Sequence, residues 1–248
     1  MNALANWSRA SRMCFECVPR ADGFGTGDCV LFLPGWGFRG DVIALEGPPP
    51  LQVFYPTRPI LDVPIEEYLE FIKDLKGQGR RVILMGWSMG GVYLYRYLDL
   101  FKEVVPRVVF CSMRRNYPAA LIDSMCEMLK RDKGLCLRYF YRECFKGQAM
   151  AYKRFKQGIE EKFVEAFTID ELLRGLEFLQ ENPVDELKSC GTEVETLLIH
   201  GEDDAVAPVG SMPEVDEGVK VVLFKGCGHL PFLQQGFFEE LIGVEGGG

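Results

Sequence analysis

The stretch "RVILMGWSMGGVYLY", residues 81–95, places one hydroxyl group between a predicted strand and a predicted helix. The apolar run from Val82 to Met85 predicts a buried strand, and the apolar spacing after Gly90 predicts a helix. Ser88 lies at the junction, inside Gly-x-Ser-x-Gly. This short pattern has two interpretations, a tight turn in which serine is merely small or an elbow that holds a nucleophile. Residues elsewhere in the chain must decide between them.

Six further runs have the length and composition of strands, and helical patterns such as "PIEEYLEFIKDLKGQG" separate them. With the run at 81–85, the candidates are "MCFECV" (13–18), "CVLFL" (29–33), "LQVFY" (51–55), "RVVFCS" (107–112), "ETLLIH" (195–200) and "KVVLF" (220–224). The runs near residues 30, 82, 108, 196 and 221 are apolar almost throughout, which is typical of strands covered on both faces. We therefore predict an α/β fold with a mostly parallel central sheet and helices on both faces.

Residues 113–190 break this alternation, because they contain no strand candidate. Their sequence favours helices, as in "AALIDSMCEMLKRDKG" and "TIDELLRGLEFLQ". No change in composition marks a linker at either end. We expect a single domain over residues 1–248, with a helical cap inserted between two strands at about 113–190.

The composition favours a soluble cytoplasmic protein. No run approaches the roughly 18 consecutive apolar residues of a membrane helix, and the first residues lack the apolar core of a secretory signal. Nine scattered cysteines, an odd number, favour reduced thiols over a disulfide framework. Cys14 and Cys17 form C-x-x-C, but no second pair completes a zinc site. We expect no metal, no cofactor and no nucleic-acid or membrane partner.

Two histidines are available to activate Ser88, which needs a base to accept its proton. Ligands of a parallel sheet bind beyond the carboxyl ends of its strands. His200 ends a predicted strand, where a histidine usually packs or bonds to a neighbouring loop. His229 lies in a glycine-flanked loop after the last strand, so we predict it as the base. Asp203 or Asp204, in the turn after residue 200, would orient it.

Three segments in this order resemble the α/β-hydrolase family, whose triad runs Ser, acid, His. They are "GWSMGG" (86–91), "HGEDDAVAP" (200–208) and "GCGHLPF" (226–232). The resemblance implies a triad of Ser88, Asp204 and His229, because alignment of the second segment favours Asp204 over Asp203.

The same resemblance implies two backbone N–H donors for an oxyanion. One belongs to Met89, directly after the serine, and the other to Trp36 in "PGWG" (34–37). Pro34 stands where many relatives have histidine. Because the donor is a backbone group, this difference does not by itself remove it.

A narrower resemblance rests on "PGWG", "GWSMGG" and "LLRGLEFLQENPVDEL" (172–187). These segments are similar to those of the carboxylesterases that demethylate pimeloyl-acyl-carrier-protein methyl ester in biotin synthesis. The resemblance implies a serine carboxylesterase with an acyl carrier protein as partner. Two alternatives stay open: a general small-ester carboxylesterase or thioesterase, and a non-catalytic binding protein with a hydrolase fold.

Charge is segregated along the chain. Residues 107–159 hold twelve Lys and Arg against four Asp and Glu, a net +8, within a chain whose total is −8. Such a segment could steer an acidic carrier protein, or it could be an ordinary solvated surface. Arg138 and Arg142, four residues apart, and Arg114 and Arg115 are the candidate docking residues.

Overall fold

The computed structural model describes residues 14–21 and 27–243. Parts of two predictions lie outside the described residues. They are position 13 of the first predicted strand, and positions 1–13, 22–26 and 244–248 of the expected single domain.

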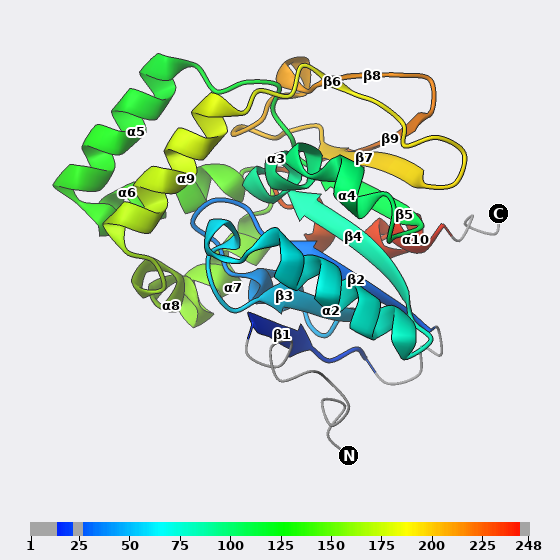
Figure 1. The fold of residues 1–248 in the computed structure, drawn as a ribbon. Helices are drawn as coiled ribbons and strands as arrows, with labels where there is room; N and C mark the ends of the chain where they lie inside the picture. Colours follow the sequence, from blue (N-terminus) through cyan, green and yellow to red (C-terminus); the bar gives the residue numbers. More distant parts are fainter. Residues whose placement is uncertain (1–13, 22–26, 244–248) are drawn as a thin grey trace.

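A seven-stranded sheet forms the centre of the molecule, in the order β1-β3-β2-β4-β5-β7-β9 (Figure 1). Strand β1 pairs antiparallel with β3, and every other pair in this sheet is parallel. The strands are β1 (Phe15–Val18), β2 (Asp28–Leu33), β3 (Gln52–Pro56), β4 (Arg81–Trp87), β5 (Arg107–Cys111), β7 (Glu195–Gly201) and β9 (Val219–Phe224). Each predicted strand overlaps one of them, and the predicted mostly parallel sheet is confirmed.

Two details of the strand prediction were wrong. Strand β9 is not covered on both faces, because it lies at the edge of the sheet and leaves Val221 and Leu223 exposed. In addition, a separate pair of two-residue strands, β6 (Glu186–Leu187) and β8 (Glu214–Val215), places one strand inside the segment predicted to be helical. Two residues are too few to produce a recognisable period.

Helices flank the sheet on both faces (Figure 1). On the near face lie α2 (Ile65–Gly77), α3 (Met89–Arg96) and α4 (Leu98–Phe101), and α10 (Phe237–Ile242) lies behind the sheet. Four short 3₁₀ turns complete the connections: Gly40–Ala44, Ile60–Asp62, Val209–Ser211 and Pro231–Leu233. Within residues 14–21 and 27–243, no helix is both long and apolar enough to cross a membrane.

Five helices between β5 and β7 form the cap, which lies at one end of the sheet (Figure 1). They are α5 (Ala119–Arg131), α6 (Lys133–Cys144), α7 (Ala149–Gly158), α8 (Glu160–Glu165) and α9 (Ile169–Glu181). Two hydrogen bonds join the cap to the loop after β2. The Tyr141 hydroxyl of the cap donates to the Gly37 carbonyl at 2.8 Å, and the Trp36 indole of the loop donates to the Leu172 carbonyl of the cap at 2.8 Å. The cap is thereby fixed over the loops that follow the strands.

Candidate active site

Ser88 occupies a strained turn between β4 and α3. Its φ of 53° and ψ of −117° are unusual for a residue with a side chain, and its N–H donates to the Cys111 carbonyl at 2.8 Å. Strand pairing with β5 therefore holds the backbone in a conformation that an ordinary turn residue avoids. Such a sharp, strained strand-to-helix turn is the backbone geometry that a nucleophile elbow requires.

Glycines make this elbow sterically feasible. A Cβ atom on Gly86 would lie 2.5 Å from the Gly90 carbonyl oxygen, and one on Gly90 would lie 2.0 Å from the Leu33 carbonyl oxygen. Both obstacles are backbone atoms, which cannot swing away as a flexible side chain can. The glycines of Gly-x-Ser-x-Gly therefore allow β4, α3 and the end of β2 to approach closely.

We expect Gly90→Ala to lower the free energy of unfolding by about 1–3 kcal/mol, the usual cost of overpacking. Urea denaturation followed by circular dichroism measures it. The matched control is Gly77→Ala at the end of α2, where an added Cβ would meet nothing within 4 Å. Equal stability of the two variants would contradict the close approach described above.

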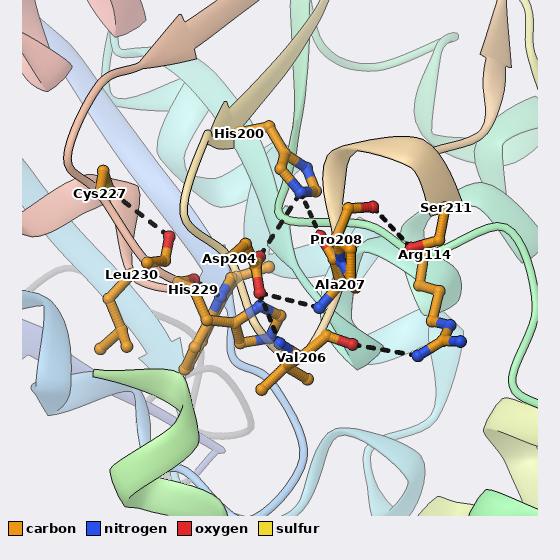
Figure 2. Close-up of polar contacts among 12 residues, drawn as sticks. Arg114, His200, Asp204, Val206, Ala207, Pro208, Ser211, Cys227, His229 and Leu230 are labelled. Atoms are coloured by element: carbon orange, nitrogen blue, oxygen red, sulfur yellow. Dashed lines mark hydrogen bonds and ion pairs between the residues drawn. The ribbon is translucent and has the colours of Figure 1, made fainter. Parts of the chain in front are cut away.

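His229 lies in the loop after β9 and is fully buried. Its N–H donates to the Cys144 carbonyl at 2.9 Å, and its own carbonyl accepts from the Trp87 indole at 2.7 Å. Its Nδ1 lies 2.7 Å from Oδ2 of Asp204 (Figure 2). The backbone of His229 is thus fixed by the cap and by β4, while its ring is oriented by the carboxylate.

Asp204, rather than Asp203, faces the histidine. Asp203 is exposed, whereas Asp204 is buried. The Oδ1 atom of Asp204 accepts from the N–H groups of Val206 and Ala207 at 2.9 and 2.8 Å, which leaves Oδ2 directed at His229. Burial alone would raise the pKa of Asp204, but the interaction and hydrogen bond with His229, helped by His200 and the Ala207 N–H, outweigh burial and hold that pKa below its usual value. The carboxylate therefore stays ionised.

His200 packs against the same turn. Its Nε2 lies 2.6 Å from the Ala207 carbonyl oxygen and 3.5 Å from Oδ2 of Asp204 (Figure 2). Burial lowers the pKa of His200, so the ring is neutral. His200 supports the turn that holds Asp204, in keeping with its place at a strand end.

The structure brings Ser88 and His229 to the same end of the sheet without joining them by a hydrogen bond. Within the described part of the chain, Nε2 of His229 has no hydrogen-bond partner. This is the ring nitrogen opposite the one that contacts Asp204. It is therefore the nitrogen available to a serine hydroxyl or to a substrate.

Met89 and Trp36 both belong to segments that adjoin the Ser88 turn. Met89 is the first residue of α3, and the Trp36 loop passes so close to Ser88 that a Cβ on Gly35 would lie 3.3 Å from the serine Cβ. Among residues 14–21 and 27–243, neither the Met89 nor the Trp36 N–H donates a hydrogen bond. Both amides are thus free to bind an oxygen atom.

A cavity of about 200 Å³ lies between Ser88 and the cap. Its walls are mainly apolar and come from the Trp36 loop and from helices α5, α6 and α9. The apolar lining residues are Trp36, Leu121, Ile122, Met125, Phe140, Leu176, Leu179, Ala205 and Val206. The polar lining residues are Ser88, Arg114, Tyr117, Tyr139 and Glu143. The sequence analysis did not predict that Tyr117 lines this cavity, because it identified residues 113–190 only as helical.

The four candidate docking arginines lie in different surroundings. Arg114 lines the cavity and donates to the Val206 carbonyl at 3.2 Å. The other three are paired with acids: Arg115 with Glu214 at 3.3 Å, Arg138 with Glu161 at 2.5 Å, and Arg142 with Glu143 at 3.3 Å. No cluster of three His, Cys, Asp or Glu side chains that could hold a metal ion occurs in the part of the chain that the structure describes.

A mostly parallel sheet with Ser88 in a strained turn after β4, a buried Asp204–His229 pair in the loops after β7 and β9, and a helical cap above them defines an α/β-hydrolase fold. The model of the Alpha/beta hydrolase family matches residues 9–241, and the chain belongs to this family.

Two curated relatives share part of the sequence. The chain is 27% identical over 173 residues to the AB hydrolase superfamily protein YisY of Bacillus subtilis (strain 168), with 64% of this chain and 63% of that protein covered. It is 31% identical over 170 residues to the pimeloyl-[acyl-carrier protein] methyl ester esterase of Nitrosomonas europaea, with 62% and 66% covered. The matches thus span slightly less than two thirds of the length of these relatives.

Solved structures agree on the fold. A lipase-esterase related protein from Clostridium acetobutylicum superposes with a TM-score of 0.61 at 18% identity, covering 94% of this chain and all of the other. A thermophilic esterase gives a TM-score of 0.64 at 16% identity, with 93% and 96% covered.

Proposed function

We propose that this protein is a serine carboxylesterase that hydrolyses the methyl ester of pimeloyl-acyl-carrier protein in biotin synthesis. The observation that carries the proposal is the position of Ser88, on a strained elbow in the wall of an apolar cavity, beside a buried Asp204–His229 pair. The similarity to the Nitrosomonas europaea esterase supports the choice of substrate.

In the proposed reaction, Nε2 of His229 accepts the proton of Ser88 as the serine oxygen attacks the ester carbonyl. Asp204 keeps the Nδ1 proton in place and stabilises the imidazolium that forms. The proton then passes to the departing methanol, and water hydrolyses the acyl-enzyme by the same route. The N–H groups of Met89 and Trp36 bind the oxyanion at each tetrahedral stage.

The cap forms most of the wall of the proposed substrate cavity. We propose one hydrolase domain whose cap, at about 113–190, covers the acyl chain, since helices α5, α6 and α9 form most of the cavity wall. Nine free cysteines agree with a cytoplasmic location for the enzyme.

The outer surface of the cap is the proposed docking face for the acidic carrier. Arg115, Arg138 and Arg142 would have to exchange their present acidic partners for those of the carrier. Four other exposed cap cations form no ion pair among the described residues; they are Lys130, Arg131, Lys146 and Lys153. These side chains can meet a carrier without breaking an ion pair, so we include them in the docking face.

Release of methanol from pimeloyl-carrier methyl ester tests the proposed function. We expect kcat/KM for the carrier-bound ester to exceed that for free dimethyl pimelate by about tenfold or more, because complementary charge raises association rates. Rapid cleavage of free short esters without cleavage of the carrier-bound ester would replace this proposal with a general carboxylesterase.

The salt dependence of the same reaction tests the docking face. The advantage of the carrier-bound ester should shrink as ionic strength rises, because exposed charges are screened. The double variant Lys130→Glu, Arg131→Glu should reduce the kcat/KM advantage of the carrier-bound ester further. The control Lys73→Glu, at an exposed position on α2, should leave that advantage unchanged. An advantage that survives both salt and charge reversal would count against the cap as the docking face.

A further inference from the structure

Two buried polar atoms in the cavity wall have no partner. They are the hydroxyl oxygen of Tyr117 and Nε of Arg114, and neither forms a hydrogen bond within the described residues. Both side chains line the cavity that Ser88 lines. A buried donor without an acceptor is costly, so such groups in a cavity indicate the chemistry of what binds there.

The two side chains are held side by side. Both belong to the segment between β5 and α5, and the Arg114 guanidinium lies 5.8 Å from the centre of the Tyr117 ring. One nitrogen of Arg114, Nη1, donates to the Val206 carbonyl beside the turn of Asp204 (Figure 2). That bond anchors the guanidinium and leaves Nε free.

Tyr117 is a neutral donor. Burial raises its pKa to about 12, and the nearby Ser88 hydroxyl opposes this rise without lying in hydrogen-bond geometry to Tyr117. Tyr117 and Ser88 line the same cavity. Arg114 is always charged and can only donate. Together they present one neutral and one cationic donor beside Ser88.

Two acids in the vicinity do not cancel this charge. Glu143 lines the same cavity but is paired with Arg142 at 3.3 Å. Asp204 lies close enough to Tyr117 to raise the pKa of its hydroxyl. The Asp204 carboxylate is, however, already bound by His229 and by two backbone N–H groups. Arg114 is left without an acidic partner among the described side chains.

We infer that Arg114 and Tyr117 form a carboxylate-binding subsite beside Ser88, which binds aliphatic carboxylates whose chains occupy the apolar cavity. Guanidinium groups pair with carboxylates through strong charge-assisted hydrogen bonds, and the apolar walls accept the chain. The inference deepens the proposed esterase function, because the acid product would be such a ligand. A half-ester with a free carboxylate at its far end is the second possible source.

Binding to the Ser88→Ala variant tests the subsite without turnover, so its outcome does not depend on the esterase proposal. Calorimetric titration should show heptanoate binding at least about tenfold tighter than heptanamide, its neutral analogue. Arg114→Met in the same background should bring this ratio close to one, and Tyr117→Phe should lower it by about threefold or more. The control Arg81→Met should leave the ratio of the two affinities unchanged, because Arg81 lies at the far end of β4 and pairs with Asp28.

Two results would overturn the inference: equal affinity for heptanoate and heptanamide in Ser88→Ala, or an unchanged ratio in both Arg114→Met and Tyr117→Phe. If Arg114→Met does not fold, Tyr117→Phe removes only one hydroxyl and still decides the matter. Wild-type enzyme with monomethyl pimelate distinguishes the two sources. Cleavage slower than that of dimethyl pimelate assigns the subsite to the acid product, and faster cleavage assigns it to the free end of a half-ester.

Discussion

Ser88→Ala is expected to abolish ester hydrolysis, with a fall in kcat of about 10⁶-fold, as for the nucleophile of a serine protease. The loss would be this large because the acyl-enzyme cannot form, while the rest of the site remains. Hydrolysis of a p-nitrophenyl ester measures it. Labelling by a fluorophosphonate probe should disappear in the same variant.

The matched control for this prediction is Ser112→Ala. Ser112 is also buried, directly follows the neighbouring strand β5 and has a positive φ of 49°, but it does not line the cavity. It should keep most of the activity and all of the labelling. A folded wild-type protein that the probe does not label would contradict the triad and favour a non-catalytic binding protein.

Local sequence was sufficient to predict the central strands and to choose the segments that we propose carry the chemistry. Buried parallel strands are short apolar runs, and the residues directly after them occupy one end of the sheet whatever the spatial order of the strands. For this reason Ser88, His229 and the turn that holds Asp203 and Asp204 could be selected before the order β1-β3-β2-β4-β5-β7-β9 was known. That order depends on pairing between distant segments, so it cannot be predicted from the sequence of any single segment.

Other features could not be predicted because they depend on three-dimensional contacts. An apolar run has the same composition at the edge of a sheet as at its centre, so the exposure of Val221 and Leu223 was missed. The choice between Asp203 and Asp204 depended on alignment with the family, because the local sequence does not reveal that two backbone N–H groups bind the Asp204 carboxylate. Tyr117 and Ser88 lie 29 positions apart in the sequence and line one cavity only in the folded protein.

Asp204→Asn is expected to lower kcat by about 10⁴-fold, because an amide cannot hold the His229 ring in the form that accepts the serine proton or stabilise its charge. A second effect concerns pH. The pKa of Asp204 is lower in the folded state than in the unfolded chain, so the carboxylate contributes stability above its unfolded pKa. That contribution is lost as pH falls toward the folded value. The unfolding free energy of Asp204→Asn should therefore fall less steeply than that of the wild type across this acidic range.

Asp203→Asn is the control that separates these effects from a general change in the turn. Asp203 precedes Asp204 but is exposed, and its N–H donates to the Cys227 carbonyl at 2.9 Å through a backbone bond that the substitution retains. This variant should keep wild-type kcat and the wild-type dependence of stability on pH. If Asp203→Asn lost activity and Asp204→Asn did not, the acid of the triad would be Asp203. The buried contact between Asp204 and His229 would then serve stability alone.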